Sequence, residues 1–206
     1  MTDIASIAKE ELKKWSSSGW VECVRHAATN KPIGNAAGQP GSIAVAKYWR
    51  KGLGDTQRNG CIDVAWSAAF VCWCLRQAGV PLDKFPFSAG HHTYIRWAIA
   101  NTKLNKAEKL FYGERVNQYA PQPGDLIAQW RKANVKDPDP AISFDSQPDD
   151  FYASHCDIVL ATRHDRVVCV GGNLDNKVKQ VTFAATHGIL KAKKSFIAIL
   201  RLKTDA

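Results

Sequence analysis

The stretch from residue 60 to residue 80, GCIDVAWSAAFVCWCLRQAGV, decides how the rest of the chain is interpreted. Residues 64–78 are apolar nearly all round, which is typical of a buried helix, and Gly79 and Pro81 end it. Ser67 then lies in the first turn, where unpaired backbone N–H groups and the positive end of the helix dipole gather. A nucleophile there would have a stabilised anion and an oxyanion site beside it, although serine is also common at helix starts. The stretch therefore predicts a buried helix with Ser67 as a candidate nucleophile.

Outward from this helix, residue periodicity predicts helices first and strands afterwards. Apolar residues at helical spacing predict further helices over 3–15, 43–51 and 91–101. Alternating apolar residues predict strands over 125–130, 156–161, 166–172, 179–185 and 196–202. Loops are expected over 27–42, which is rich in Gly, Pro and Asn, and over the polar insertion 131–154. Helices followed by an antiparallel meander predict an α+β fold.

Composition and charge narrow the classes of partner. The chain has 206 residues, 45% of them hydrophobic, and a formal net charge of +9. No apolar run approaches the roughly 20 residues that cross a bilayer, so no stable membrane insertion is expected. The basic residues are dispersed and do not alternate with aromatics, so nucleic acid is not an expected partner. A basic surface still suits an anionic partner such as a cell-wall polymer.

Cysteine spacing and the N-terminus bear on the compartment. The six Cys, at 23, 61, 72, 74, 156 and 169, form no CxxC pair, which argues against a structural zinc site. They are interpreted as small buried hydrophobic residues. The N-terminal sequence MTDIASIAKEELKKW lacks the features of a signal peptide, so the protein is expected to be made in the cytoplasm without one.

A nucleophile needs a base, and His155 is the first candidate. His155 opens the strand HCDIVLA, and strand alternation places it on one face with Asp157 and Val159. Counting residues around the turn TRHD brings Asn173 of the sequence GGN within reach of the His155 ring. A polar residue that orients an imidazole completes a nucleophile–base–orienter set. The prediction is Ser67 as nucleophile, His155 as base and Asn173 as orienter.

Four motifs occur in a familiar order: WSAAFVCWCLRQAG, PGDLI, HCDIV and GGN, over roughly residues 60–175. In order and spacing they resemble the papain-like cell-wall peptidases and amidases of the CHAP and NlpC type. With Ser in place of the nucleophilic Cys, and with the added element SAGHHTYI, the chain is more similar still to a bacterial branch of that group. The resemblance implies a papain-like α+β domain over 1–206, with N-terminal helices packed on an antiparallel sheet. Residues 1–59 would be a helical extension and 60–206 the catalytic core, carrying the insertion 131–154.

The same resemblance implies a function. It points to an amidase or endopeptidase of peptidoglycan that needs neither a metal nor another cofactor. It also implies an antibacterial toxin that type VI secretion delivers to the periplasm of a rival cell. Peptidoglycan, an immunity protein and a secretion-apparatus protein are then the expected partners. Two alternatives stay open: an inactive papain-like module that binds cell-wall peptide or a protein partner, and a Ser-dependent lipid or thioester hydrolase.

Alternatives also stay open within the site. A hydroxyl is harder to ionise than a thiol, so Cys61, Asp63 or His91 are further candidates for the reactive group. Asp157 is expected to support His155, or to form a metal-binding niche with His155 and Asp63. His91 and Tyr94 share one helix face three residues apart, and the resemblance suggests that they line the cleft. The insertion 131–154 is expected to be a lid over Ser67, or else a surface decoration.

Overall fold

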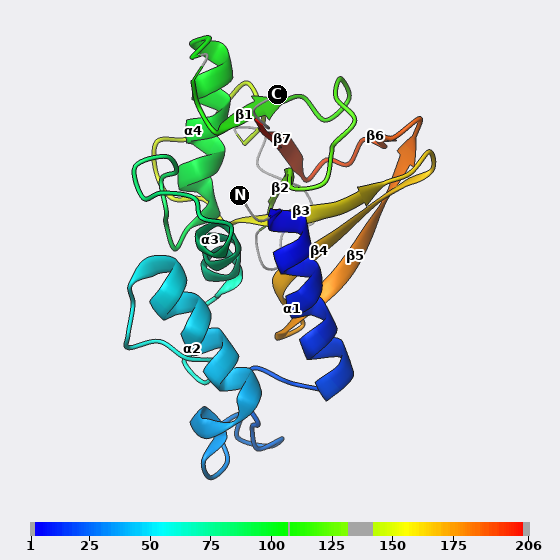
Figure 1. Cartoon of the computed structure of the whole chain (residues 1–206). Coiled ribbons are helices and arrows are strands. Elements are labelled where there is room, and N and C mark those ends of the chain that lie inside the picture. The colour runs from blue at the N-terminus through cyan, green and yellow to red at the C-terminus, as the bar shows by residue number, and fades with distance from the viewer. Residues whose placement is uncertain (1–2, 107, 132–141, 204–206) are drawn as a thin grey trace.

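The computed structural model describes residues 3–106, 108–131 and 142–203 (Figure 1). Within them the helices precede all the strands. The helices are α1 (Ile4–Ser18), the short 3₁₀ helix η1 (Ala36–Gly38), α2 (Pro40–Leu53), α3 (Ser67–Gln77) and α4 (His91–Lys103). The strands are β1 (Phe111–Glu114), β2 (Leu126–Trp130), β3 (Ser154–Thr162), β4 (Arg166–Leu174), β5 (Lys177–Thr186), β6 (Ile189–Leu190) and β7 (Phe196–Leu202).

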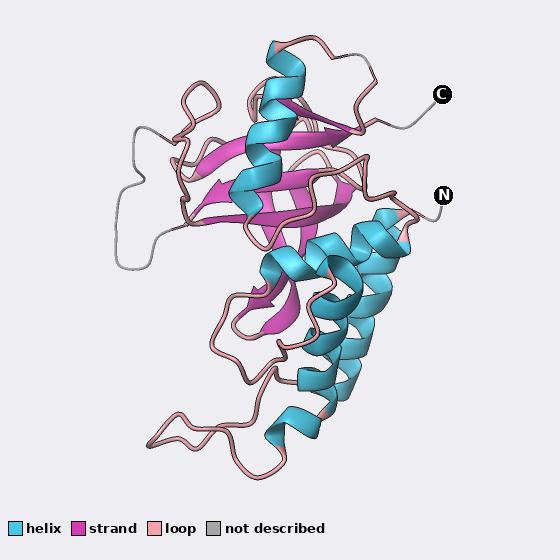
Figure 2. Cartoon of the chain, turned by 90° about the vertical axis from the view of Figure 1, so that its left-hand side faces the viewer, coloured by secondary structure: helices cyan, strands magenta, loops and turns pink. Residues whose placement is uncertain are grey.

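The strands form one curled antiparallel sheet in the order β1-β7-β2-β3-β4-β5-β6. The predicted α+β fold, with N-terminal helices packed on an antiparallel sheet, is confirmed. In Figure 2, α4 lies across the sheet, whereas α1, α2 and α3 gather at one end of it. The predicted alternation of β3 is also confirmed, because Cys156 and Ile158 join the main core whereas Val159 joins a second apolar cluster.

The expected boundaries differ from the observed ones where local chemistry overrides the apolar pattern. Helix α3 begins at Ser67 and not at residue 64, because residues 61–64 form turns and Trp66 has non-helical backbone angles at the N-cap. Helix α2 begins three residues before its expected start, with Pro40 in the first turn, where a missing N–H costs nothing. The short strands β1 and β6 were not predicted, since they are too brief to show alternation.

An aromatic cluster joins the N-terminal helices to the start of α3. Trp15 of α1 stacks on Trp66, with ring centroids 5.7 Å apart, and Tyr48 of α2 contacts Trp66 and Phe70. All four rings are buried in the same core as Ile158 of the sheet. Aromatic pairs of this geometry add stability beyond the area they bury. The N-terminal helices therefore fix the position of the residue that directly precedes Ser67.

One expectation about the cysteines is wrong. Cys23 and Cys61 form a disulfide, so neither is a free hydrophobic side chain, and Cys61 has no thiol to offer as a nucleophile. Cys72, Cys74, Cys156 and Cys169 are free and buried, as expected. Sequence spacing could not reveal the bridge, because it joins the segment after α1 to the loop before α3, and only the fold brings them together.

Losing the disulfide is expected to destabilise the fold. Its cysteines are 38 residues apart in sequence. Closing a loop of that size lowers the conformational entropy of the unfolded chain, which stabilises the folded state by about 3–4 kcal/mol. We expect the double variant Cys23→Ser/Cys61→Ser to lose about that much free energy of unfolding in urea titrations. The double variant should no longer respond to reductant, whereas the native protein should. Equal stability of the two proteins without reductant would contradict the bridge.

Within the described residues no helix is long and apolar enough to cross a membrane.

Candidate active site

The N-termini of two helices bring Ser67 and His91 together. Ser67 is the first residue of α3 and His91 the first residue of α4. The Ser67 hydroxyl oxygen lies 2.6 Å from Nε2 of His91, and both side chains are buried. Nδ1 of His91 is hydrogen-bonded to the hydroxyl of Tyr94, one turn further along α4. The three side chains therefore form one buried chain of hydrogen bonds that ends at the start of α3.

Burial keeps this chain of groups uncharged. Burial lowers the pKa of His91 well below its usual value, and the nearby His155, Arg131 and His92 lower it further. Burial likewise raises the pKa of the Tyr94 hydroxyl well above its usual value. Near neutral pH His91 is therefore a neutral imidazole and Tyr94 a neutral phenol. His91 and Tyr94, which were predicted on one helix face, are joined by this hydrogen bond, and their place in a cleft stays a prediction.

A second polar chain lies on strands β2 and β3. Nε2 of His155 is 2.9 Å from Oδ1 of Asp157, two residues along the same strand face. The other carboxylate oxygen, Oδ2, accepts a hydrogen bond of 2.8 Å from the side-chain amide of Gln129. Gln129 pairs with His155 across the strands, which explains how its side chain reaches Asp157. Sequence reasoning missed Gln129, because the β2–β3 register could not be counted across the insertion.

The first glycine of GGN, Gly171, makes room for the second chain. A Cβ at Gly171 would lie 2.1 Å from Oδ1 of Asp157 and 3.0 Å from Nε2 of His155. Only a glycine lets β4 approach these two groups so closely. The register shifts after Gly171, and Asn173 has a φ of 57° there. Among the described residues no hydrogen bond joins Asn173 to His155, and the side chain that contacts the ring of His155 is Asp157.

Adding a methyl group at Gly171 is expected to disturb the contact of Asp157 with His155 while the protein stays folded. Gly171→Ala forces its Cβ against the Asp157 carboxylate, and overpacking of this kind costs about 1–3 kcal/mol. We expect a urea midpoint lowered accordingly and an altered ring NMR signal for His155. Thr182→Ala, at an exposed position of the neighbouring strand β5, is the control and should change neither. A Gly171→Ala protein with native stability and a native His155 signal would show that the contact is not tight.

The two polar chains meet at their imidazoles. The rings of His91 and His155 have centroids 5.3 Å apart and are tilted by 55°. Five of the residues predicted for the site are thus brought together: Ser67, His91, Tyr94, His155 and Asp157. The pairing differs from the prediction, since the hydrogen bond of Ser67 goes to His91, which comes from the neighbouring helix α4. Local patterns could not show that pairing, because it depends on how α3 and α4 pack.

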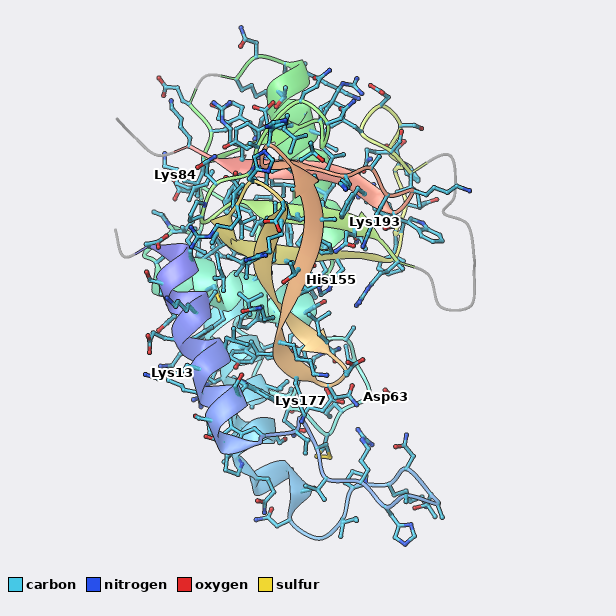
Figure 3. All side chains as sticks on the ribbon, turned by 90° about the vertical axis from the view of Figure 1, so that its right-hand side faces the viewer. Lys13, Asp63, Lys84, His155, Lys177 and Lys193 are labelled. Atoms are coloured by element: carbon cyan, nitrogen blue, oxygen red, sulfur yellow. A yellow bond between two sulfur atoms is a disulfide. The ribbon has the colours of Figure 1, made fainter. Side chains whose placement is uncertain are left out.

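Asp63 does not join this cluster. Figure 3 shows it apart from His155, toward the loops at the bottom of the view. Its charge acts on Glu22, whose side chain accepts a hydrogen bond from the indole of Trp66 and whose pKa is raised, mainly by burial. Within the described ranges no three His, Cys, Asp or Glu side chains gather in a way that could hold a metal ion. The niche of His155, Asp157 and Asp63 considered from the sequence is therefore not formed.

The described part of the insertion, residues 142–153, is fastened to α4 beside the site. Arg96 donates hydrogen bonds to the backbone carbonyls of residues 148–150. The ring of His92, next to His91, lies against the rings of Phe151 and Tyr152 at centroid distances of 5.1 and 5.7 Å. Residues 132–141 of the insertion lie outside the described residues. Its role as a lid stays a prediction, with one end placed next to His91.

The comparisons with known proteins concern the whole of this region. No curated protein and no solved structure matches the chain. Residues 20–198 match the family model described as "Uncharacterized protein conserved in bacteria (DUF2272)". This range contains both polar chains and the disulfide, and it covers well over half of the sequence. The chain therefore belongs to the bacterial family DUF2272.

Proposed function

We propose that the protein is a serine hydrolase with a papain-like arrangement that cleaves an amide or peptide bond of bacterial peptidoglycan. The observation that carries the proposal is the 2.6 Å contact between the Ser67 hydroxyl and His91 at the start of a buried helix. A hydroxyl at a helix start that contacts one imidazole, with a second imidazole beside it, is the kind of cluster that covalent catalysis uses. Here two imidazoles are available, one oriented by Tyr94 and the other by Asp157.

The order of the elements supports the papain-like part of the proposal. Ser67 begins the helix α3, and His155 is the second residue of β3. The glycines of GGN follow on the adjacent strand β4. That is the order of the motifs that resemble CHAP and NlpC-type enzymes. The match to these enzymes is closest if Asp157, in place of Asn173, orients the ring of His155.

The chemistry requires few groups. The Ser67 oxygen attacks the carbonyl carbon, and its proton passes to an imidazole. The backbone N–H groups at the start of α3 receive the carbonyl oxygen as it becomes negative. The protonated imidazole then gives its proton to the leaving amine as the C–N bond breaks. Water hydrolyses the acyl-serine that remains, so neither a metal nor another cofactor enters the proposal.

Charge and oxidation state support a site of action in the cell envelope. The net charge of +9 favours anionic wall polymers, and Figure 3 shows Lys13, Lys84, Lys177 and Lys193 on different parts of the surface. Basic side chains spread over the surface suit contact with an extended anionic polymer better than binding of nucleic acid in one basic groove. The Cys23–Cys61 disulfide suits an oxidising compartment such as the bacterial periplasm. Delivery as an antibacterial toxin by type VI secretion, with an immunity protein and a secretion-apparatus partner, belongs to the same proposal.

Digestion of purified peptidoglycan tests the proposal. The native, disulfide-bonded protein should release fragments with new amino and carboxyl ends, identified by mass spectrometry, and Ser67→Ala should release none. Parallel assays on thioesters and on phospholipid vesicles separate the lipid or thioester hydrolase from the amidase. Hydrolysis of those substrates alone would overturn the choice of peptidoglycan but keep the serine chemistry.

A second candidate function is a binding module that has lost catalysis. The observation that favours it is burial, because Ser67 is only 7% exposed and His155 only 1%. Such a module should bind peptidoglycan fragments without cleaving them, with the same affinity before and after Ser67→Ala. Cleavage by the native protein would exclude it.

A further inference from the structure

The two imidazoles of the site are held by chemically different partners. His91 contacts a phenol, that of Tyr94, through Nδ1, and its Nε2 faces the Ser67 oxygen. His155 contacts a carboxylate, that of Asp157, through Nε2. A phenol can donate or accept a hydrogen bond, whereas an ionised carboxylate can only accept. The partners therefore decide where each ring carries its proton.

The Tyr94 hydroxyl fixes the tautomer of His91. The hydroxyl is fully buried, and within the described residues its hydrogen-bond partner is Nδ1 of His91. A buried phenol satisfies its single O–H by donating it, so Nδ1 must accept. The lowered pKa of His91 leaves the ring neutral with one proton, which then resides on Nε2. This Nε2–H donates to the Ser67 oxygen, so His91 in this form cannot accept the Ser67 proton.

The Asp157 carboxylate fixes the tautomer of His155. One carboxylate oxygen faces Nε2 of His155, and the other already accepts from Gln129. The Gln129 amide thus holds the carboxylate in place as an acceptor toward the ring. In the neutral ring the proton of His155 therefore resides on Nε2, which leaves the lone pair of that ring on Nδ1. Its Nδ1 is the nitrogen able to accept a proton, and the ring lies next to that of His91.

We propose that the two histidines divide the work on Ser67: His155 removes its proton through Nδ1, and His91 donates a hydrogen bond from Nε2 to the same oxygen. The proposal rests on the proposed serine hydrolase function. As the Ser67 O–H bond breaks, the proton binds Nδ1 of His155 and the oxygen bonds to the substrate carbonyl carbon. The His91 N–H stabilises the negative charge on the Ser67 oxygen during this step. The proton on His155, next to the Asp157 carboxylate, then passes to the leaving nitrogen.

Nitrogen NMR tests the tautomers without any need for activity. In protein labelled with ¹⁵N-histidine, long-range ¹H–¹⁵N spectra distinguish an Nδ1–H ring from an Nε2–H ring, and His91→Gln and His155→Gln assign the signals. We expect a protonated Nε2 in both rings, with Nδ1 of His91 shifted by the hydrogen bond from Tyr94 and Nδ1 of His155 unshifted. Tyr94→Phe should remove that shift and let His91 exchange between tautomers, while His155 stays unchanged. Tyr112→Phe, on strand β1, is the control. A proton on Nδ1 of His91 in the native protein would overturn the proposal.

Reaction rates with a fluorophosphonate test the roles. His155→Gln should lose more of the labelling rate than any His91 variant, because the acceptor of the proton is lost. His91→Ala should slow labelling by about 10²-fold, the usual effect of removing one hydrogen-bond donor to a developing anion. His91→Gln, whose amide can still donate, should recover part of that loss. The reverse ranking of His91 and His155 would overturn the proposal. Native protein with the expected tautomers but no labelling would overturn the proposed function and leave the tautomer assignment standing.

Discussion

Replacing Ser67 with alanine is expected to lower peptidoglycan hydrolysis by about a thousandfold or more while the fold persists. The variant removes the only atom of this side chain that can bond to a carbonyl carbon, and it leaves the helix start in place. Its melting temperature should stay within a few degrees of the native value, because a buried alanine is compatible with the first turn of α3. Combining Ser67→Ala with His155→Ala should cost little more than either change alone, since the two groups act as a unit.

Ser67→Cys is the matched variant. It places a thiol where papain-like enzymes have one, so hydrolysis should be kept or raised, and iodoacetamide should now inactivate the protein. The reagent should leave the native protein untouched, because its four free cysteines are buried and burial raises their thiol pKa values. Full activity of Ser67→Ala would show that another group performs the reaction.

The second large effect is expected at Asp157. Asp157→Asn keeps the size of the side chain but removes the obligate acceptor, so the ring of His155 is no longer fixed with its proton on Nε2. A comparable change in a serine protease triad lowers the rate on the order of 10⁴-fold, and we expect a loss of at least about 10³-fold here. Steady-state hydrolysis should show the loss mainly in kcat, because Asp157 acts through His155 and not through substrate binding.

Asp165→Asn provides the control for the change of charge. Asp165 is exposed in the β3–β4 turn and pairs with Arg166 at the surface, so its loss should leave the rate unchanged. Full activity of Asp157→Asn, or an equal loss in both variants, would contradict the role of Asp157.

The sequence predicted the parts of the fold that depend on local pattern. The apolar run around Phe70 predicted α3, and the alternation around Ile158 predicted β3 with its two faces. It did not predict the position of η1, β1 or β6, which are too short to carry a period of their own. The order of helices before strands was sufficient to predict the α+β class.

Five members of the candidate site were predicted, but the partner of Ser67 was not. Ser67, His91, Tyr94, His155 and Asp157 were all named from motifs and spacing. The contact between Ser67 and His91 depends on how α3 meets α4, and the place of Asn173 depends on where the register shifts in β4; neither feature has a signal in a single sequence. The disulfide was missed for the same reason, because it links segments 38 residues apart.

Covalent labelling shows whether Ser67 is a working nucleophile. The native protein, with its disulfide intact, is treated with a fluorophosphonate probe and digested, and the modified peptide is identified by mass spectrometry. We expect a single adduct on Ser67, absent from Ser67→Ala and from protein unfolded before treatment. No adduct on Ser67 in the folded protein, or an equal adduct on the unfolded chain, would contradict it.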